Sequence, residues 1–338
     1  MSAPAEARAA VFTTSRDLPI SPDEAFALIT EPERLRRWQT VSATVDLRAG
    51  GEYRWTVTPG HVAAGTYQEV EPGRRLVFGW GWTDSDELGP DASTVTVTIE
   101  PAETGSRVTI THTGLPTPEL VSGHAEGWEH YLDRLEKIAA TGDAGPDEWA
   151  AVPADLNPIT AAEATLAVLQ PVLRGLTNED KVKQTPCDDF TCHDLAVHLF
   201  GAIIGVGTMG GIEIVNAGLG SLENQVSVMA DQALTAFRAR GLEGTAPGPG
   251  GHGGAPVSLA PTILTLEFLL HAWDFAQASG QQVVVADGLV DYVQGLAEQV
   301  VPGARGNGSF KAAQPAPAGA SKLEMLAAFA GRTVPAAA

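Results

Sequence analysis

Two side chains with metal-ligand chemistry lie at helical spacing in the second half of the 338-residue chain. Glu267 and His271 are four residues apart, so they share one face of the helix predicted over 258–279. That segment is apolar nearly all round, which places it centrally in its domain. An ionised carboxylate buried there without a partner would cost several kcal/mol, so Glu267 needs a compensating group.

An earlier predicted helix supplies a second imidazole. Thr191 and Asp194 form a helix-start signal, and the apolar stripe that follows carries His198 inward, whereas His193 in the first turn faces solvent. Two histidines and a glutamate converging from facing helices are a suitable ligand set for a divalent transition metal. Three protein ligands leave a position open for water or substrate. Asp274, on the later helix, is placed to orient a ligand.

The same residues have a simpler explanation. A Glu-x-x-x-His spacing arises often by chance, and a single buried histidine is usually a hydrogen-bonded core residue. Glu267 could be ion-paired with an arginine, and His198 could bond a backbone carbonyl. The spacing therefore leaves open both a metal centre and a purely structural pair.

The elements that must position these side chains fall into two groups. In the first group the pattern alternates in strand fashion, with Gly and Pro turns between the runs. Strands are predicted at 11–18, 42–47, 52–58, 61–70, 75–82, 93–100 and 106–113. A short helix begins after Ser21, and a long amphipathic helix begins after Thr117 and carries apolar residues to Ile138. A curved antiparallel sheet covered by such a helix commonly leaves a cavity between them.

The second group is helical. Residues 141–158 are rich in Gly, Pro and Asp and are predicted to be an interdomain linker, which gives domains at 1–140 and 159–334. Helices are predicted at 159–175, 192–206, 222–240, 258–279, 287–301 and 321–330. The segment 243–258 holds too much Gly and Pro to pack, so we expect a mobile loop with His252 exposed to solvent.

The composition argues against several partner classes. With 41 acidic and 21 basic residues the net charge is −20, which repels phosphate backbones and anionic lipid, so no nucleic-acid or membrane partner is expected. The first residues lack a signal-peptide core, and no uninterrupted apolar stretch of about 18 residues is present. Two cysteines in a chain of this length favour the reducing cytoplasm, although the spacing of Cys187 and Cys192 leaves a disulfide open. Cys187, at a helix-entry loop, is expected to be a buried structural thiol, and a reactive thiol is the alternative.

Several motifs of the first half fall in a recognisable order, at 22–26, 47–51, 65–67, 75–78, 109–114 and 127–135. Together they resemble the heat-shock-chaperone-activator-like branch of the START (SRPBCC) superfamily, across about residues 11–140. The resemblance implies an α+β helix-grip fold, a curved antiparallel sheet plus a long C-terminal helix, whose cavity binds a small hydrophobic molecule. Trp80 and Trp82 share one strand face and could line that cavity. Chaperone binding is not implied, and no chaperone partner is expected.

The second half carries another set of motifs, at 185–187, 190–199, 267–280, 308–310 and 326–332. They resemble the DinB-like, mycothiol-dependent maleylpyruvate isomerase group, including an actinobacterial subgroup, over roughly residues 158–334. The resemblance implies an all-α four-helix bundle with a divalent metal, usually zinc, on a histidine of the second helix and a Glu and a His of the fourth. The corresponding residues are His198, Glu267 and His271. Phe190 stands where the family usually has tryptophan.

These observations favour a metal-dependent enzyme. Many members of the resembled group use mycothiol as cosubstrate, and a bound metal makes a thiolate or hydroxide available near neutral pH. The hypothesis is a thiol-dependent isomerase or transferase acting on a small hydrophobic electrophile held by the first domain; the catalytic and thiol-binding residues are not assigned. The alternative is a non-enzymatic small-molecule-binding or stress-response protein with a structural or vestigial metal site. A protein-partner adaptor is a third interpretation.

Overall fold

A computed structural model gives the fold and describes residues 10–151, 153, 155–187, 190–248, 253–306 and 308–335. The chain divides into two compact units, Met1–Asp147 and Glu148–Ala338. The division falls inside the segment predicted to be a linker. Residues before it fold back on their own unit, because Asp147 Oδ1 lies 3.0 Å from His130 Nε2.

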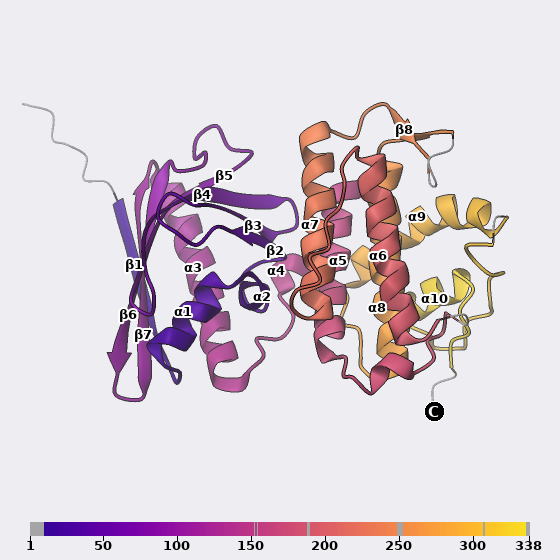
Figure 1. The fold of residues 1–338 in the computed structure, drawn as a ribbon, viewed down its shortest axis with the longest axis horizontal. Helices are drawn as coiled ribbons and strands as arrows, with labels where there is room; N and C mark the ends of the chain where they lie inside the picture. Colours follow the sequence, from indigo (N-terminus) through magenta and orange to yellow (C-terminus); the bar gives the residue numbers. More distant parts are fainter. Residues whose placement is uncertain are drawn as a thin grey trace, which may run out of the picture. The chain divides into compact units, whose positions relative to one another are not determined.

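The first unit is a seven-stranded antiparallel sheet with the strand order β1-β7-β6-β5-β4-β3-β2 (Figure 1). The strands are β1 (Ala10–Leu18), β2 (Ser42–Val45), β3 (Glu52–Thr58), β4 (His61–Glu71), β5 (Arg75–Trp82), β6 (Ser93–Ala102) and β7 (Gly105–Leu115). The helices are α1 (Pro22–Thr30), α2 (Pro32–Leu35) and α3 (Pro118–Thr141). Each predicted strand is present, and the sheet with its long following helix fits the helix-grip fold.

Local signals explain where α3 begins and ends. The Thr117 side chain accepts a hydrogen bond from the backbone N–H of Leu120, and Pro118 occupies the first turn, where no amide hydrogen is needed. At the other end Gly142 adopts a left-handed conformation with φ 82°, which a residue with a side chain would rarely adopt. Between these caps Trp128 and Leu135 are buried on the face that packs toward the sheet.

Aromatic side chains fill the space between α3 and the sheet. Tyr53, Trp55 and Phe78 contact one another with ring centroids 4.5–5.6 Å apart, and Trp80 extends the cluster. A pocket of about 10 Å³ remains among Trp55, Phe78 and Trp128, which is room for a single water. The cavity expected from the fold is therefore nearly filled at this position, because the inward-facing residues are large.

The second unit is mainly helical. Its helices are α4 (Glu148–Ala151), α5 (Pro158–Gly175), the short 3₁₀ turn Asp180–Val182, α6 (Cys192–Met209), α7 (Leu222–Arg240), α8 (Leu259–Ser279), α9 (Asp287–Arg305) and α10 (Lys322–Phe329). Both α5 and α6 pack against α7 and α8, so these four form a bundle (Figure 1). Helix α9 packs against α5, α8 and α10.

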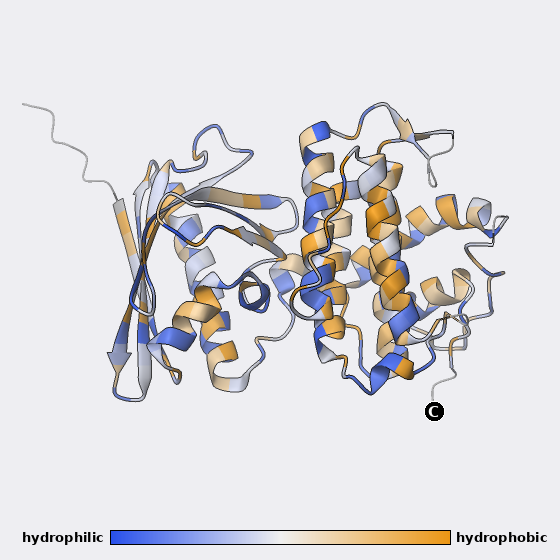
Figure 2. Ribbon diagram, in the orientation of Figure 1, coloured by the Kyte–Doolittle hydropathy of each residue, from blue (hydrophilic) through white to orange (hydrophobic). Residues whose placement is uncertain are grey.

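Helix α6 is unusually apolar for a helix that contains two histidines. Thr191 caps it in a reciprocal box with Asp194, and Figure 2 shows hydrophobic residues along most of its length. By length and composition α6 could cross a membrane, an exception to the expectation that no segment would qualify. In the protein 44% of this stretch is buried, and core helices of soluble proteins pass the same test, so the indication of a span is weak.

The Gly- and Pro-rich segment before α8 contains ordered backbone pairing. Strands β8 (Thr245–Pro247) and β9 (Gly254–Pro256) form an antiparallel hairpin, with Ala246 and Ala255 buried. The expectation of a wholly mobile loop was wrong for these two ends, because backbone hydrogen bonds order a segment that has few side chains to pack. His252 lies outside the described residues.

Candidate metal centre

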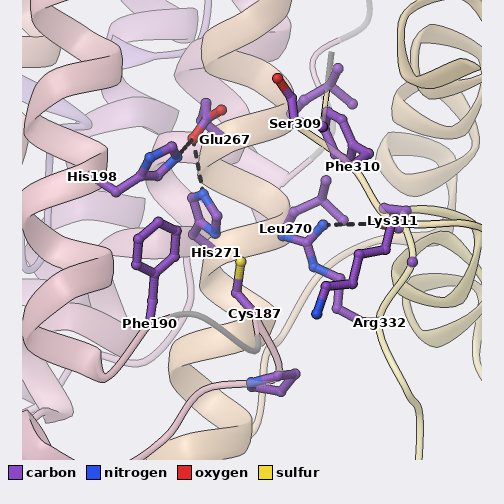
Figure 3. A pocket seen from close by; sticks show the side chains of 15 residues that line it. Cys187, Phe190, His198, Glu267, Leu270, His271, Ser309, Phe310, Lys311 and Arg332 are labelled. Atoms are coloured by element: carbon purple, nitrogen blue, oxygen red, sulfur yellow. Dashed lines mark hydrogen bonds and ion pairs between the residues drawn. The ribbon is translucent and has the colours of Figure 1, made fainter. Parts of the chain in front are cut away.

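The structure brings His198, Glu267 and His271 together inside the second unit (Figure 3). His198 comes from α6, and the other two come from successive turns of α8. One oxygen, Glu267 Oε2, lies 3.1 Å from His198 Nε2 and 2.9 Å from His271 Nε2. The three potential ligand atoms lie within 4.8 Å of one another.

This geometry fits a small divalent cation. In a tetrahedral zinc site with bonds of about 2.0–2.2 Å, neighbouring ligand atoms lie about 3.3 Å apart. The two nitrogen-to-oxygen distances are a few tenths of an ångström shorter, and the two imidazole nitrogens lie within 4.8 Å of each other, so the side chains would have to shift to hold an ion. Two imidazoles and one carboxylate are also the donor set of many catalytic zinc sites, with a fourth position free.

The charges of the cluster favour a cation between the side chains. Burial alone would raise the pKa of Glu267, but the imidazoles of His271 and His198 outweigh burial and hold this pKa well below its usual value. Burial would lower the pKa of His271, but Glu267 and Asp274 outweigh it and raise this pKa to about 9. In the metal-free protein a proton on His271 thus supplies the positive charge that a metal would supply.

Asp274 fixes the ring of His271 from behind. It is completely buried, and its Oδ2 accepts a hydrogen bond of 2.9 Å from His271 Nδ1. Burial would raise the pKa of Asp274, but the guanidinium of Arg332 outweighs it and lowers this pKa, so the carboxylate can only accept. The nitrogen Nε2 of His271 is therefore the one turned toward Glu267, as a metal ligand requires.

A pocket of about 310 Å³ opens beside the three candidate ligands. The ring of Phe190 stacks on His198, with centroids 5.2 Å apart and planes 28° apart. Figure 3 shows Phe190 and Cys187 on the side of His198 and His271, and Ser309, Phe310 and Lys311 across the pocket. The lining residues are 186–187, 190, 198, 266–267, 270–271, 308–311 and 330–332.

Two residues of this pocket were missed or misjudged from the sequence. The sequence places Arg332 only in the tail motif 326–332, because its role depends on a contact with Asp274, 58 residues away, that no spacing rule predicts. Cys187 was expected to be a buried structural thiol, but it is only half-buried and lines the pocket. Both Cys187 and Cys192 are free thiols, so the disulfide left open by the sequence is not formed.

Two histidines of the first unit, His112 and His124, also lie side by side. The rings of His112 and His124 are 5.1 Å apart at their centroids, and both residues are buried. Their ring nitrogens bond Trp128, Ser93 and other neutral groups, and no carboxylate joins them in the part of the chain that the structure describes. This pair lacks the donor set of a metal centre.

The sequence of the first unit matches a known family. Residues 19–140 match the family described as Activator of Hsp90 ATPase homolog 1-like protein, AHSA1. The solution structure of an AHSA1-like protein from Rhizobium etli is 36% identical, covers 44% of this chain and 94% of the relative, and has a TM-score of 0.37. The crystal structure of DynU16, from the dynemicin biosynthetic locus, is 20% identical over 44% of this chain and 57% of that one, with a TM-score of 0.38.

A relative also extends into the second unit. An uncharacterized protein of Mycobacterium tuberculosis, found in two strains, is 28% identical over 185 residues, which are 53% of this chain and 100% of the relative. Because the first unit ends at Asp147, a match of that length must include part of the second unit.

Through its first unit, the chain belongs to the AHSA1-like family of the SRPBCC type.

Proposed function

We propose that the second unit binds a divalent metal, preferably zinc, and uses it to act on a small electrophilic molecule with the help of a thiol or water. The observation that supports this most directly is the convergence of His198, Glu267 and His271 at the edge of a pocket. A ligand-sized pocket typically begins at about 300 Å³, which the volume of about 310 Å³ reaches. We also propose that this part of the chain is a DinB-like bundle, as its motifs suggest.

The candidate ligands, the ring beside them and the apolar wall residues would each have a separate role. His198, Glu267 and His271 would hold the ion, which when bound lowers the pKa of a thiol or water and so provides a nucleophile near neutral pH. Phe190 stacks on the His198 ring and limits its rotation. Leu266, Leu270 and Phe310 give the pocket apolar walls that exclude water around the reacting groups.

Charge on the far wall bears on which molecules would enter. Two basic residues, Lys311 and Arg332, line the pocket, and Arg332 is paired with Asp274. An apolar molecule that carries a carboxylate or carbonyl oxygen would suit this combination of walls. Mycothiol or another low-molecular-weight thiol is the proposed cosubstrate, and thiol-dependent isomerisation or transfer is the proposed reaction class.

A turnover assay tests this proposal. Purified full-length protein, metal-free or loaded with zinc, would be mixed with a low-molecular-weight thiol and a panel of α,β-unsaturated carbonyl compounds and epoxides, and thiol loss would be followed. We expect zinc-dependent turnover that falls at least about 100-fold in His271→Gln, which removes a ligand. His193→Gln, on the exposed face of α6, is the matched control and should keep full activity. No zinc-dependent rate across the panel would refute the enzyme proposal.

The AHSA1-like match favours a second candidate function, which is small-molecule binding without turnover. In this case the first unit would sequester a hydrophobic ligand, and the cation site would be structural. The tightly packed rings of Trp55, Phe78 and Trp128 would have to move, because the pocket among them holds about 10 Å³. Native mass spectrometry of protein purified from cells tests this: a retained small molecule that is lost in Trp55→Ala supports the binding function, and its absence counts against it.

A further inference from the structure

We infer that Arg332 is a positioning residue of the metal centre, which acts on His271 through Asp274. The inference rests on the proposed metal site and adds a residue to it from a different part of the chain. Arg332 lies beyond α10, and 58 residues separate it from Asp274 on α8. Arg332 itself is not proposed as a ligand.

The contacts form a continuous chain of buried hydrogen bonds. Arg332 Nη2 donates to Asp274 Oδ2 over 2.9 Å, and Nε donates to Oδ1 over 3.3 Å, so the guanidinium grips both carboxylate oxygens. The same Oδ2 accepts from His271 Nδ1. A two-point grip fixes the plane of the carboxylate, which a single bond would leave free to rotate.

The fixed carboxylate in turn fixes the imidazole. Within the part of the chain that the structure describes, the His271 ring makes polar contacts with Asp274 on one nitrogen and with Glu267 on the other. If the carboxylate turned, the ring would turn with it, and Nε2 would leave the point where His198 also converges. Second contacts of this kind commonly change metal affinity by about 10–100-fold.

The ion pair of Arg332 and Asp274 is buried, so removing one partner costs more free energy than it would at the surface. Arg332 is 7% exposed and Asp274 is 0% exposed, so neither charge can be hydrated if the other is removed. The backbone brings Arg332 to this position by a tight turn: Gly331 has φ +92°, and a Cβ there would lie 2.9 Å from the backbone oxygen of Lys311. The N–H of Arg332 also bonds the carbonyl of Ala327 at 3.0 Å.

A second arginine provides a matched control. Arg305 bonds the carbonyls of Phe329 and Lys311, and its guanidinium lies over the Phe329 ring, so it anchors the same segment. Among the described residues, Arg305 makes no hydrogen bond or ion pair with Asp274 or with the three candidate ligands. Arg305→Gln therefore loosens the segment, whereas Arg332→Gln also removes the grip on Asp274.

The experiment titrates Co²⁺ into metal-free full-length protein and follows the visible d–d absorption, which reports both affinity and ligand geometry. We expect Arg332→Gln to weaken binding by about 10–100-fold and to change the band shape, while Arg305→Gln stays within about threefold of the unaltered chain. In a chain that already carries Asp274→Asn, Arg332→Gln should weaken Co²⁺ binding by less than about a further threefold, because Arg332 acts on His271 only through Asp274. Arg332→Lys, which keeps the charge but not the two-point grip, should give an intermediate affinity and serves if the Gln variant does not fold.

The outcomes separate the inference from the proposal beneath it. If the unaltered chain binds no Co²⁺, the metal site itself fails. If it binds Co²⁺ and Arg332→Gln binds equally well, or if Arg305→Gln loses as much affinity as Arg332→Gln, the positioning role is overturned. The same holds if Arg332→Gln loses its full effect again in the Asp274→Asn background, or if Arg332→Lys binds as tightly as the unaltered chain.

Discussion

Each unit of the protein contains a cluster of two histidines, and the two clusters have opposite electrostatics. Of these four histidines, only His198 is not buried. In the first unit Trp128 Nε1 donates to His112 Nδ1 at 3.1 Å, and Ser93 Oγ lies 2.9 Å from Nε2. Because Nδ1 accepts, the hydrogen of the neutral ring is on Nε2 and points to Ser93, whose hydroxyl bonds the carbonyl of Trp80. Burial, helped by neighbouring His124, lowers the pKa of His112 to about 3.

In the second unit the buried histidine faces carboxylates instead. His271 lies between Asp274 and Glu267, and burial, which by itself would lower its pKa, is outweighed so that the pKa rises to about 9. Both rings are less than a tenth exposed. Burial therefore does not decide the charge of such a histidine: neutral indole and hydroxyl partners leave the ring neutral, and carboxylate partners favour a positive charge, as the proposed metal site requires.

The largest expected effect comes from removing a carboxylate of the second cluster. Asp274→Ala leaves Arg332 buried without its partner, and we expect the second unit to lose about 3–5 kcal/mol of unfolding free energy. Hydrogen exchange of α8 and α3 peptides in the full chain would measure each unit separately. Asp291→Ala is the control, because its ion pair with Lys322 is exposed and should contribute less than about 1 kcal/mol. Equal losses of unfolding free energy in the two variants would show that the buried network stabilises the second unit no more than an exposed ion pair does.

A smaller effect is expected in the first cluster. His112→Phe keeps an aromatic ring but leaves Trp128 Nε1 without its acceptor. We therefore expect the first unit to lose about 1–3 kcal/mol of unfolding free energy, and only the hydrogen exchange of α3 and the sheet to become faster. His61→Phe, on an exposed ring, should change stability by about 0.5 kcal/mol or less. If His112→Phe were harmless, the interpretation of this cluster as a structural polar network would be wrong.

The two clusters should also respond to pH in opposite directions. The pKa of His112 falls from 6.5 in the reference state to about 3, so its contribution to stability is present above pH 6.5 and is lost as the pH falls toward 3. The pKa of His271 rises from 6.5 to about 9, so in metal-free protein its contribution is present below pH 6.5 and is lost as the pH rises through 9. Exchange of α3 and α8 measured from pH 4 to 9 should diverge accordingly. If the stabilities of the two units changed with pH in the same direction, the two histidine clusters would not have opposite electrostatics.

The smallest expected effect distinguishes two histidines of one helix. His193 is exposed in the first turn of α6, and His198 faces Glu267 one turn later. His193→Gln should change zinc affinity by less than about twofold and stability by less than about 0.5 kcal/mol, whereas His198→Gln should abolish high-affinity binding. Isothermal titration of zinc into each variant is the measurement. Equal affinity losses would place the ion elsewhere.

Local patterns were enough to predict most elements. The bounds of β3, β5 and α7 were predicted to the residue, because turn residues and caps mark their ends. Helical spacing was also enough to put Glu267 and His271 on one face, and the stripe of α6 turned His198 toward Glu267, although the His198 side chain stays 37% exposed. Residue spacing was therefore enough to predict the set of candidate ligands.

Long-range packing accounts for what the sequence could not supply. Arg332 reaches Asp274 across 58 residues, and nothing local in either segment encodes that pairing. The filled interior of the first unit depends on how the rings of Tyr53, Trp55 and Phe78 stack, which alternation alone does not determine. The β8–β9 hairpin was missed because backbone pairing, and not side-chain pattern, orders it.

The central claim is that carboxylate partners turn the histidine cluster of the second unit into a metal centre. Elemental analysis of untagged full-length protein after exposure to zinc and removal of excess metal tests it most directly, with Glu267→Gln beside the unaltered chain. The account predicts about one zinc ion per unaltered chain and close to none in Glu267→Gln, with both proteins folded. Equal zinc content in the two proteins, or no zinc in either, would contradict it.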